Sequence, residues 1–305
     1  MITRTYLFNK ATATVVGAGI CMAAVTTCFA QTDTVTKLPQ VTVHGEDSSG
    51  DVLAEERLVG ENQQPEWTTQ RRFATTRIYV LEPWQFEFEQ WWKGKFLRGS
   101  GTDHLFQSEL EVGLPYRFQL DVYENLQKSP GSSLKHKGNQ VELRYAFAEW
   151  GKIPLNPAIY GEWKFNKNDP DAYEVKFLLG EQIAPRWHWG ANLFFEQEVG
   201  GGRESEMGFA QGISYTLPDE KFSVGVEMNL ERASGPNLDG KPSTEFLIGP
   251  SAQWRPTSRI HLDLVPMIGA TDDSPRVEAF IVFGFDFWKP STKSGEYQPS
   301  STRAR

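Results

Sequence analysis

The chain has 305 residues, of which 39% are hydrophobic, 13% aromatic and 23% charged, and its formal net charge is −8. Past residue 30 it holds no run of about 18 apolar residues, which excludes a helical membrane protein. The many Phe and Trp residues exclude a disordered chain, and the acidic balance argues against binding to nucleic acid. A polar average with abundant aromatic residues is typical of transmembrane β-strands, which alternate lipid-facing apolar and lumen-facing polar residues.

Residues 1–30 have the pattern of a secretory signal peptide. Arg4 and Lys10 precede an apolar stretch, and small residues lead to Ala30, after which we expect cleavage. The alternatives are a retained membrane anchor and a lipoprotein attached through Cys28. Cleavage removes both cysteines and leaves 29 basic against 39 acidic residues, a net charge of −10. The mature chain would then lack disulfides and thiolate metal sites, as suits export to the outer membrane of a Gram-negative bacterium.

Residues 31–80 are polar, with short apolar clusters only. We expect a largely unstructured periplasmic extension or a partial plug. The stretch Leu38 to Gly45 is similar to the segment near the mature N-terminus of TonB-dependent receptors, which implies a TonB-like partner that pairs with it as an added strand. The distance to the first predicted strand is too short for the plug domain of those receptors. The alternative is an extension with no partner.

From residue 84 onward, apolar and polar residues alternate with a period of two, the signal for half-buried strands. Residues 222–231 and 278–287 show it most clearly. Counting such runs predicts twelve strands, near 84–94, 104–113, 116–127, 140–150, 158–166, 173–181, 186–197, 205–217, 221–231, 244–254, 258–269 and 277–287. The sequence thus predicts an all-β fold, a transmembrane antiparallel up-and-down β-barrel of about 12 strands over residues 81–288, followed by a polar C-terminal tail, 289–305.

The connections between these strands are of two alternating kinds. Tight, proline-containing turns fall at 114–115, 153–157, 184–185, 217–219 and 255–257, and longer or more polar segments separate the other strand pairs. A soluble sandwich has no reason for this order. A membrane barrel does, because its periplasmic turns are short and its outer loops are longer.

Aromatic residues gather at the proline-turn ends of the predicted strands. Such side chains favour the membrane interface, where one end of the ring is apolar and the other wet. We expect an interface ring of Trp84, Tyr116, Trp150, Trp187, Tyr215, Phe222, Trp254 and Trp288. Candidates for the opposite ring are Trp91, Trp92, Tyr123 and Phe195.

The proline turns, the alternating hairpins and a last strand ending Phe-Gly-Phe-Asp-Phe-Trp at 283–288 resemble bacterial outer-membrane barrels of the small-transporter type. They are similar to the family named for the MetA pathway of phenol degradation. The resemblance covers about residues 84–288 and implies passage of a small-molecule solute. It also implies insertion into outer-membrane lipid by the barrel-assembly machinery, although a polar tail follows the last strand here.

If the apolar faces point to lipid, charged residues line the lumen. The candidates are Glu87, Glu89, Glu109, Glu111, Arg117, Asp121, Glu142, Arg144, Arg186, His188, Glu227, Glu245, His261 and Asp263. Two interpretations stay open: a hydrated pathway that filters solutes by charge, and a lumen filled by opposed charges. Paired acids on the first two strands could bind a hard cation, but nearby bases favour ion pairs, so we expect no metal and no cofactor.

The sequence offers weak signals for catalysis. His261 and Asp263 share one strand face, which is half of a catalytic triad, but no nucleophile accompanies them. We therefore expect a non-enzymatic channel or transporter for small solutes, hydrophobic ones included. The alternatives are a closed structural or partner-binding barrel that acts through its outer loops, and a barrel-embedded lipid hydrolase.

Overall fold

The computed structural model describes residues 53–99, 101–236, 241–288 and, for the backbone, 295–296. The expected signal peptide at 1–30, the TonB-like segment at 38–45 and most of the tail at 289–305 lie outside the described residues. The chain divides into two units, 1–48 and 49–305, and all that follows concerns the second. Within the described part, no helix is long and apolar enough to cross a membrane.

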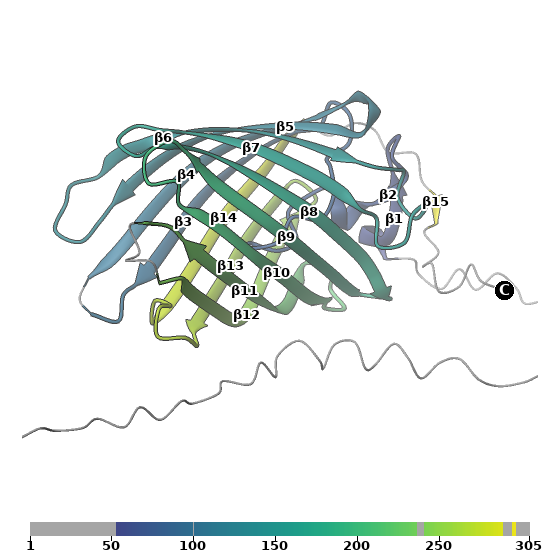
Figure 1. Cartoon of the computed structure of the whole chain (residues 1–305). Coiled ribbons are helices and arrows are strands. Elements are labelled where there is room, and N and C mark those ends of the chain that lie inside the picture. Colours follow the sequence, from purple (N-terminus) through teal and green to yellow (C-terminus); the bar gives the residue numbers. More distant parts are fainter. Residues whose placement is uncertain (1–52, 100, 237–240, 289–294, 297–305) are drawn as a thin grey trace, which may run out of the picture. The chain divides into compact units, whose positions relative to one another are not determined.

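Twelve antiparallel strands close into a barrel (Figure 1), as predicted. Each strand pairs with its sequence neighbours, and the last pairs with the first. The strands are β3 (Phe86–Phe96), β4 (Thr102–Leu114), β5 (Phe118–Lys128), β6 (Lys135–Ala146), β7 (Ala158–Asn166), β8 (Asp171–Ala184), β9 (Trp187–Val199), β10 (Ser205–Thr216), β11 (Phe222–Ser234), β12 (Ser243–Thr257), β13 (Ile260–Gly269) and β14 (Val277–Trp288).

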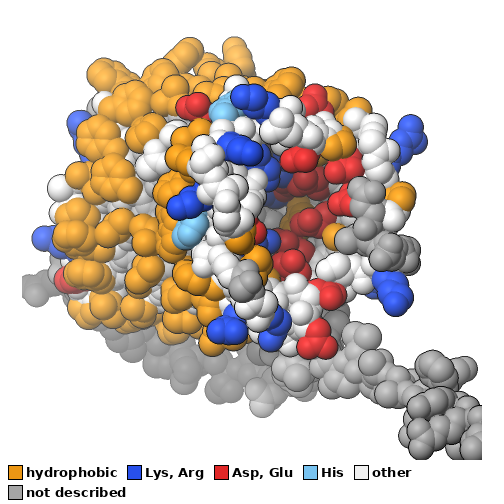
Figure 2. All heavy atoms as spheres, turned by 90° about the vertical axis from the view of Figure 1, so that its left-hand side faces the viewer, with side chains coloured by type: hydrophobic (Ala, Val, Ile, Leu, Met, Phe, Trp, Pro, Cys, Tyr) orange, Lys and Arg blue, Asp and Glu red, His pale blue; other side chains and the backbone are white. Residues whose placement is uncertain are grey.

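Alternation along each strand separates an apolar outside from a polar inside. In β13, His261 and Asp263 are buried in the lumen, whereas Leu262 and Leu264 are exposed on the outer surface. The same two-residue period runs along the other strands, except where a β-bulge shifts it, because successive side chains of a strand point to opposite faces. Seen from the left-hand side of Figure 1, hydrophobic side chains cover one side of the molecule, and acidic side chains gather in a hollow beside them (Figure 2).

The two ends of the barrel differ in their connections. We call the end with segments 115–117, 147–157, 185–186, 217–221 and 258–259 the proline-turn end, and the other the long-loop end. One connection departs from the prediction, since β6 stops at Ala146 and the chain to β7 is not tight. Trp150 leaves the strand, is only 3% exposed and packs edge-on against Trp67 and Tyr79, with ring centroids 5.6 and 5.2 Å away. The prediction that Trp150 belongs to the interface ring is therefore wrong.

The other predicted members of the interface ring at the proline-turn end lie on the outer surface. They are Trp84, Tyr116, Trp187, Tyr215, Phe222, Trp254 and Trp288, all at least partly exposed. At the opposite end the prediction is half wrong: Trp92 and Phe195 face outward, but Trp91 and Tyr123 are buried in the lumen. These two share the strand face of the lumen carboxylates, which points inward.

Residues 53–85, here called the plug, occupy the lumen at the proline-turn end. The plug contains η1 (Ala54–Glu56), β1 (Arg57–Val59), β2 (Gln64–Pro65) and η2 (Glu66–Thr68), then runs extended into β3. β1 also pairs with β15 (Gly295–Glu296). The buried side chains of the plug include Trp67, Phe73 and Tyr79.

Glycines of the barrel wall lie where side chains of the plug approach the wall backbone closely. A Cβ atom added at Gly212 would lie 2.4 Å from Cδ1 of Phe73, and one at Gly190 would lie 3.4 Å from Cε2 of the same ring. Glycine within a strand often marks such a close approach by another part of the chain. The wall and the plug are thus fitted to each other.

Candidate functional site: the lumen and its plug

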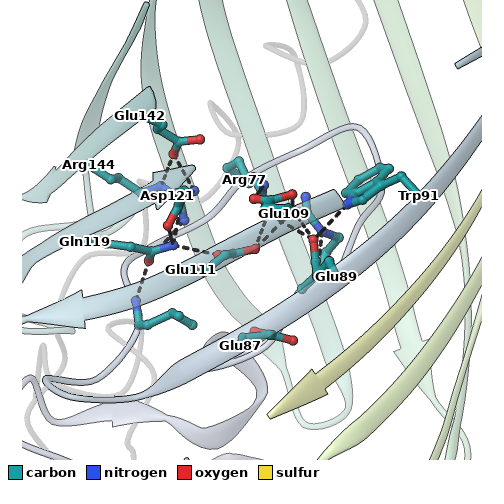
Figure 3. A network of polar contacts seen from close by, with 12 residues as sticks. Arg77, Glu87, Glu89, Trp91, Glu109, Glu111, Gln119, Asp121, Glu142 and Arg144 are labelled. Carbon is teal, nitrogen blue, oxygen red and sulfur yellow. Dashed lines mark hydrogen bonds and ion pairs between the residues drawn. The ribbon is translucent and has the colours of Figure 1, made fainter. Parts of the chain in front are cut away.

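Carboxylates crowd the inner wall where β3, β4 and β5 meet (Figure 3). Glu87 lies opposite Glu111, and Glu89 lies opposite Glu109, in directly paired positions. Asp121 follows opposite Glu111 on the next strand. All five are buried. Like charges in directly opposed positions repel one another, so this wall requires cations from elsewhere in the fold.

The plug supplies those cations. The Nε of Arg71 donates to both carboxylate oxygens of Glu89, at 2.8 and 2.7 Å, and its Nη2 lies 3.3 Å from Oε2 of Glu109. Arg77 bonds Glu109 and places Nη1 3.4 Å from Oε1 of Glu111. The guanidinium carbon of Arg71 also lies 4.2 Å from the ring centroid of Trp91. Fork-shaped guanidinium groups suit such multiple carboxylate contacts.

Side chains of the barrel wall also bond the backbone of the plug. Arg144 of β6 bonds Glu142 and Asp121, at 2.6 and 3.1 Å, and donates to the carbonyl oxygen of Tyr79 at 2.8 Å. The side-chain amide of Asn192 of β9 accepts from the backbone N–H of Arg77 at 2.8 Å and donates to its carbonyl oxygen at 2.6 Å. Buried peptide groups need such partners, and here the barrel wall provides them.

A second ionic group fixes the start of the plug. Glu55 accepts from Arg72 at 3.0 Å and from Arg255 of β12. Burial opposes ionisation of Glu55, but the two guanidinium groups outweigh it and hold the pKa of this carboxyl below its usual range. His188 of β9 lies against Arg72, with Nδ1 2.6 Å from Nη2. Arg72 also donates to Thr216, Ser223 and Gln253, at 2.7, 2.8 and 3.3 Å, so it contacts four wall strands.

The histidine considered for catalysis is enclosed by acids. Nδ1 of His261 lies 2.5 Å from Oδ2 of Asp263, and Nε2 lies 3.0 Å from Oε1 of Glu87. Glu89 is 3.3 Å from the same Nε2. Both ring nitrogens therefore contact carboxylates, and among the described residues no hydroxyl or thiol bonds the ring. Its geometry is that of a structural ion pair.

Two predicted lumen residues lie elsewhere. Arg117 and Arg186 occupy turns with φ of 66° and 68°. Arg117 donates to the carbonyl oxygen of Ala146, and Arg186 donates to that of Leu217 at 2.9 Å. Their assignment to the lumen wall is wrong because a left-handed turn ends the two-residue period that set the direction of each side chain.

The remaining predicted residues face the lumen. Glu227 accepts from the backbone and hydroxyl of Thr75, at 2.8 and 2.7 Å. Glu245 lies near the long-loop end, 3.6 Å from Nζ of Lys95. Thus Glu227 holds the plug, whereas Glu245 belongs to the outer half of the lumen.

Three groups of side chains could offer ligands to a metal ion. They are Glu87, Glu89 and His261; Glu89, Glu109 and Glu111; and Glu109, Asp121 and Glu142, each with candidate atoms within 4.8 Å of one another. Arg71, Arg77 and Arg144 already stand against these carboxylates. Because those guanidinium groups balance the charge, the donor set fits ion pairs better than a divalent cation.

The long-loop half of the lumen is hollow. An outer cavity of about 540 Å³ and a middle cavity of about 380 Å³ share Lys137, Lys164 and Glu196 in their linings. The middle cavity shares Lys93 and Phe280 with an inner one of about 250 Å³, whose lining includes Arg71 and Arg77. Behind these arginines a cavity of about 20 Å³ has room for about one water. The open space thus ends at the plug.

Sequence reasoning missed the plug arginines. Arg71, Arg72 and Arg77 lie in a polar stretch without strand periodicity, so no pattern placed them in the lumen. A signal did exist: the predicted inward faces held more acids than bases, and the adjacent pair Arg71 and Arg72 stood just upstream. Charge balance would have pointed to them.

Comparisons with known proteins support the fold. No protein-family model matches the chain, and no curated protein matches it. Among solved structures, an outer-membrane channel from Pseudomonas putida F1 aligns over 68% of this chain and 97% of its own, with 9% identity and a TM-score of 0.50. The NanC porin (11% identity, 67% and 100% coverage, TM-score 0.47) and the KdgM porin in complex with disordered oligogalacturonate (10%, 67% and 99%, 0.44) also align. At such identities the likeness concerns the fold alone: the chain is a closed β-barrel whose fold is similar to that of the outer-membrane channel from Pseudomonas putida F1.

Proposed function

We propose that this chain is an outer-membrane channel for small solutes, which enter the lumen at the long-loop end and leave when the plug shifts. The observation that carries the proposal is the series of adjoining cavities that ends on Arg71 and Arg77 of the plug. The exposed apolar side chains on the outward strand faces suit contact with lipid. Membership of the small-transporter type related to the MetA-pathway family is part of this proposal.

Conductance measurements in planar lipid bilayers test the channel proposal. Full-length protein should give small conductance steps, because the plug fills the lumen at the proline-turn end and the cavity behind Arg71 and Arg77 has a volume of only about 20 Å³. The double variant R71Q/R77Q should give larger steps, since it removes the plug's contacts with Glu89, Glu109 and Glu111. Lys135→Gln, at an exposed position of β6, is the control and should conduct like the parent. Correctly folded protein that stays silent in both parent and R71Q/R77Q would contradict a channel.

One observation favours a second function. The plug bonds residues of β3, β4, β6, β9, β11 and β12, so it is tied to much of the wall. A permanently closed barrel, which acts through its outer loops, would be built in this way. In that case trimming the β5–β6 loop, 129–134, would abolish partner binding at the cell surface, while R71Q/R77Q would change nothing but stability.

Two partners belong to the channel proposal. Strand β14 ends in Phe287 and Trp288, and we expect the barrel-assembly machinery to use this end for insertion. A TonB-like protein pairing with residues 38–45 would provide force to move the plug. Deletion of 38–45 should then abolish energised uptake of the solute. Unchanged uptake in the deletion strain would remove TonB from the proposal and leave a passive channel.

A further inference from the structure

One lysine of the lumen differs from the others. Lys93 lies 3.0 Å from Glu278, Lys95 lies 3.3 Å from the same residue, and Lys164 and Lys176 both contact Glu174, at 2.8 and 2.5 Å. Lys137 has no ion pair within the described ranges. It is half-buried and lines both the outer and the middle cavity. Its ammonium group therefore faces open space and, unlike those of the other lumen lysines, is not neutralised by a contacting carboxylate, which suits an anionic partner from outside the chain.

A β-bulge directs Lys137 into the lumen. Asn125 of β5 pairs with Gly138, whereas Leu126 pairs with His136, so Lys137 is the extra residue on β6. Without the bulge, Lys137 would share the outward face of Asn139 and Val141. Bulges commonly re-aim a side chain in this way and are frequent near functional sites. The fold therefore places this ammonium group at the junction of two cavities.

An unsatisfied amide lies next to it. Asn125 is 5% exposed and lines the outer cavity, and its Oδ1 has no hydrogen-bond partner in the described part of the chain. Buried side-chain amides are normally bonded, so the unpartnered Oδ1 marks a position where Asn125 can take a further partner. An amide presents NH₂ donors as well as an acceptor, and its two ends can exchange places by rotation. The ammonium group of Lys137 and the amide NH₂ of Asn125 can therefore both donate hydrogen bonds to a carboxylate.

Aromatic rings lie deeper in the same space. The middle cavity, lined at its outer side by Lys137, reaches Phe194 and Phe280, and the inner cavity continues along Trp91 and Tyr160. Its volume of about 380 Å³ falls in the usual range for small-molecule sites, about 300–1,000 Å³. Basic residues outnumber acids in the linings of the middle and inner cavities. An anionic head at Lys137 and an apolar body toward Phe280 would match this arrangement.

We propose that Lys137 and Asn125 form a binding site for the carboxylate of a small amphiphilic monoanion whose apolar part lies against Phe194 and Phe280. The inference rests on the proposed function in treating the lumen as the path of the solute, and it names the class of that solute. The four acids of the outer cavity would favour a cation instead, so the test compares both charges; they are Asp169, Glu196, Glu198 and Glu204.

Three probes of nearly equal shape separate the possibilities: benzoate, benzamide and benzamidinium. Equilibrium dialysis against the folded full chain in detergent, at low salt, gives their dissociation constants. We expect benzoate to bind about tenfold more tightly than benzamide, the ratio for one charge-assisted hydrogen bond. Lys137→Gln should remove this preference, Lys137→Arg should keep most of it, and Asn125→Leu should weaken benzoate several-fold.

Lys135→Gln is the matched control, two residues away on β6 and exposed; it should bind as the parent does. Heat-modifiable migration on a gel shows that each variant folds. Equal binding of benzoate and benzamide to the parent, an unchanged preference in Lys137→Gln, or tighter binding of benzamidinium would each overturn the site. Binding does not need conduction, so a barrel that is silent in bilayers but prefers benzoate through Lys137 would refute the channel and retain the site.

Discussion

Arg71 of the plug and Glu89 of β3 form an ion pair of 2.5 Å that is almost wholly shielded from solvent, with side chains 3% and 0% exposed. The pair joins a segment without strand periodicity to the wall of the barrel. Because both charges are buried, each depends on the other, and loss of one leaves the other uncompensated.

Arg71→Gln should therefore loosen the plug. It leaves Glu89, Glu109 and Glu111 with Arg77 as the nearest plug cation, at a cost of about 3–5 kcal/mol. We expect faster amide hydrogen exchange over residues 69–85 and unchanged exchange in the barrel strands. Arg57→Gln, at an exposed plug position, is the control and should leave exchange unaltered. Equal protection in Arg71→Gln and the parent would mean that the ion pair does not hold the plug.

Gly212→Ala should displace Phe73. The added methyl group would lie 2.4 Å from Cδ1 of that ring, and overpacking of this kind costs about 1–3 kcal/mol. Gly161→Ala is the control, because its Cβ would meet nothing within 4 Å. Exchange rates of the plug amides again measure the effect.

A second variant checks the cause. Phe73→Ala alone should destabilise the plug by about 3–5 kcal/mol, since Phe73 is fully buried. In the double variant Gly212→Ala/Phe73→Ala, the cost of the glycine change should vanish. If the two changes add without coupling, Gly212 does not act through Phe73.

Leu193→Arg tests whether the outer surface faces lipid. Leu193 lies in the middle of β9, is 55% exposed and points outward. An arginine at the bilayer midplane destabilises a barrel by about 2–4 kcal/mol. Ser133→Arg, in the exposed β5–β6 loop, should have little effect. Urea unfolding in lipid vesicles gives both free energies, and equal values would argue against a membrane-spanning outer face.

Glu55 gives the plug a dependence on pH. Its pKa is lowered in the folded state, so it stabilises the plug above its ordinary pKa of 4.5, and this contribution is lost as the pH falls toward the folded pKa. Glu55→Gln leaves Arg72 and Arg255 without their counterion and should raise conductance at pH 7. The difference from the parent should shrink between pH 5 and pH 3. A constant difference over this range would show that ionised Glu55 does not hold the plug.

The barrel and the direction of most strand residues follow from the amino-acid pattern. Alternation is a local property: from Phe222 to Glu231 each side chain's face follows from its position in the strand, and the twelve strands close as predicted. His261 and Asp263 could be placed on one face for the same reason.

The contents of the lumen, in contrast, depend on contacts between distant parts of the chain. Arg71 and Arg77 belong to a segment without periodicity, so the sequence does not show that they contact carboxylates of the wall. Trp150 points inward because Trp67 and Tyr79 of the plug pack against it. Lys137 faces inward because a β-bulge shifts the two-residue period by one residue. The residues around Lys137 give no pattern that predicts this bulge. Periodicity fixes which face a strand residue occupies, but contacts between distant segments depend on how the closed barrel brings them together.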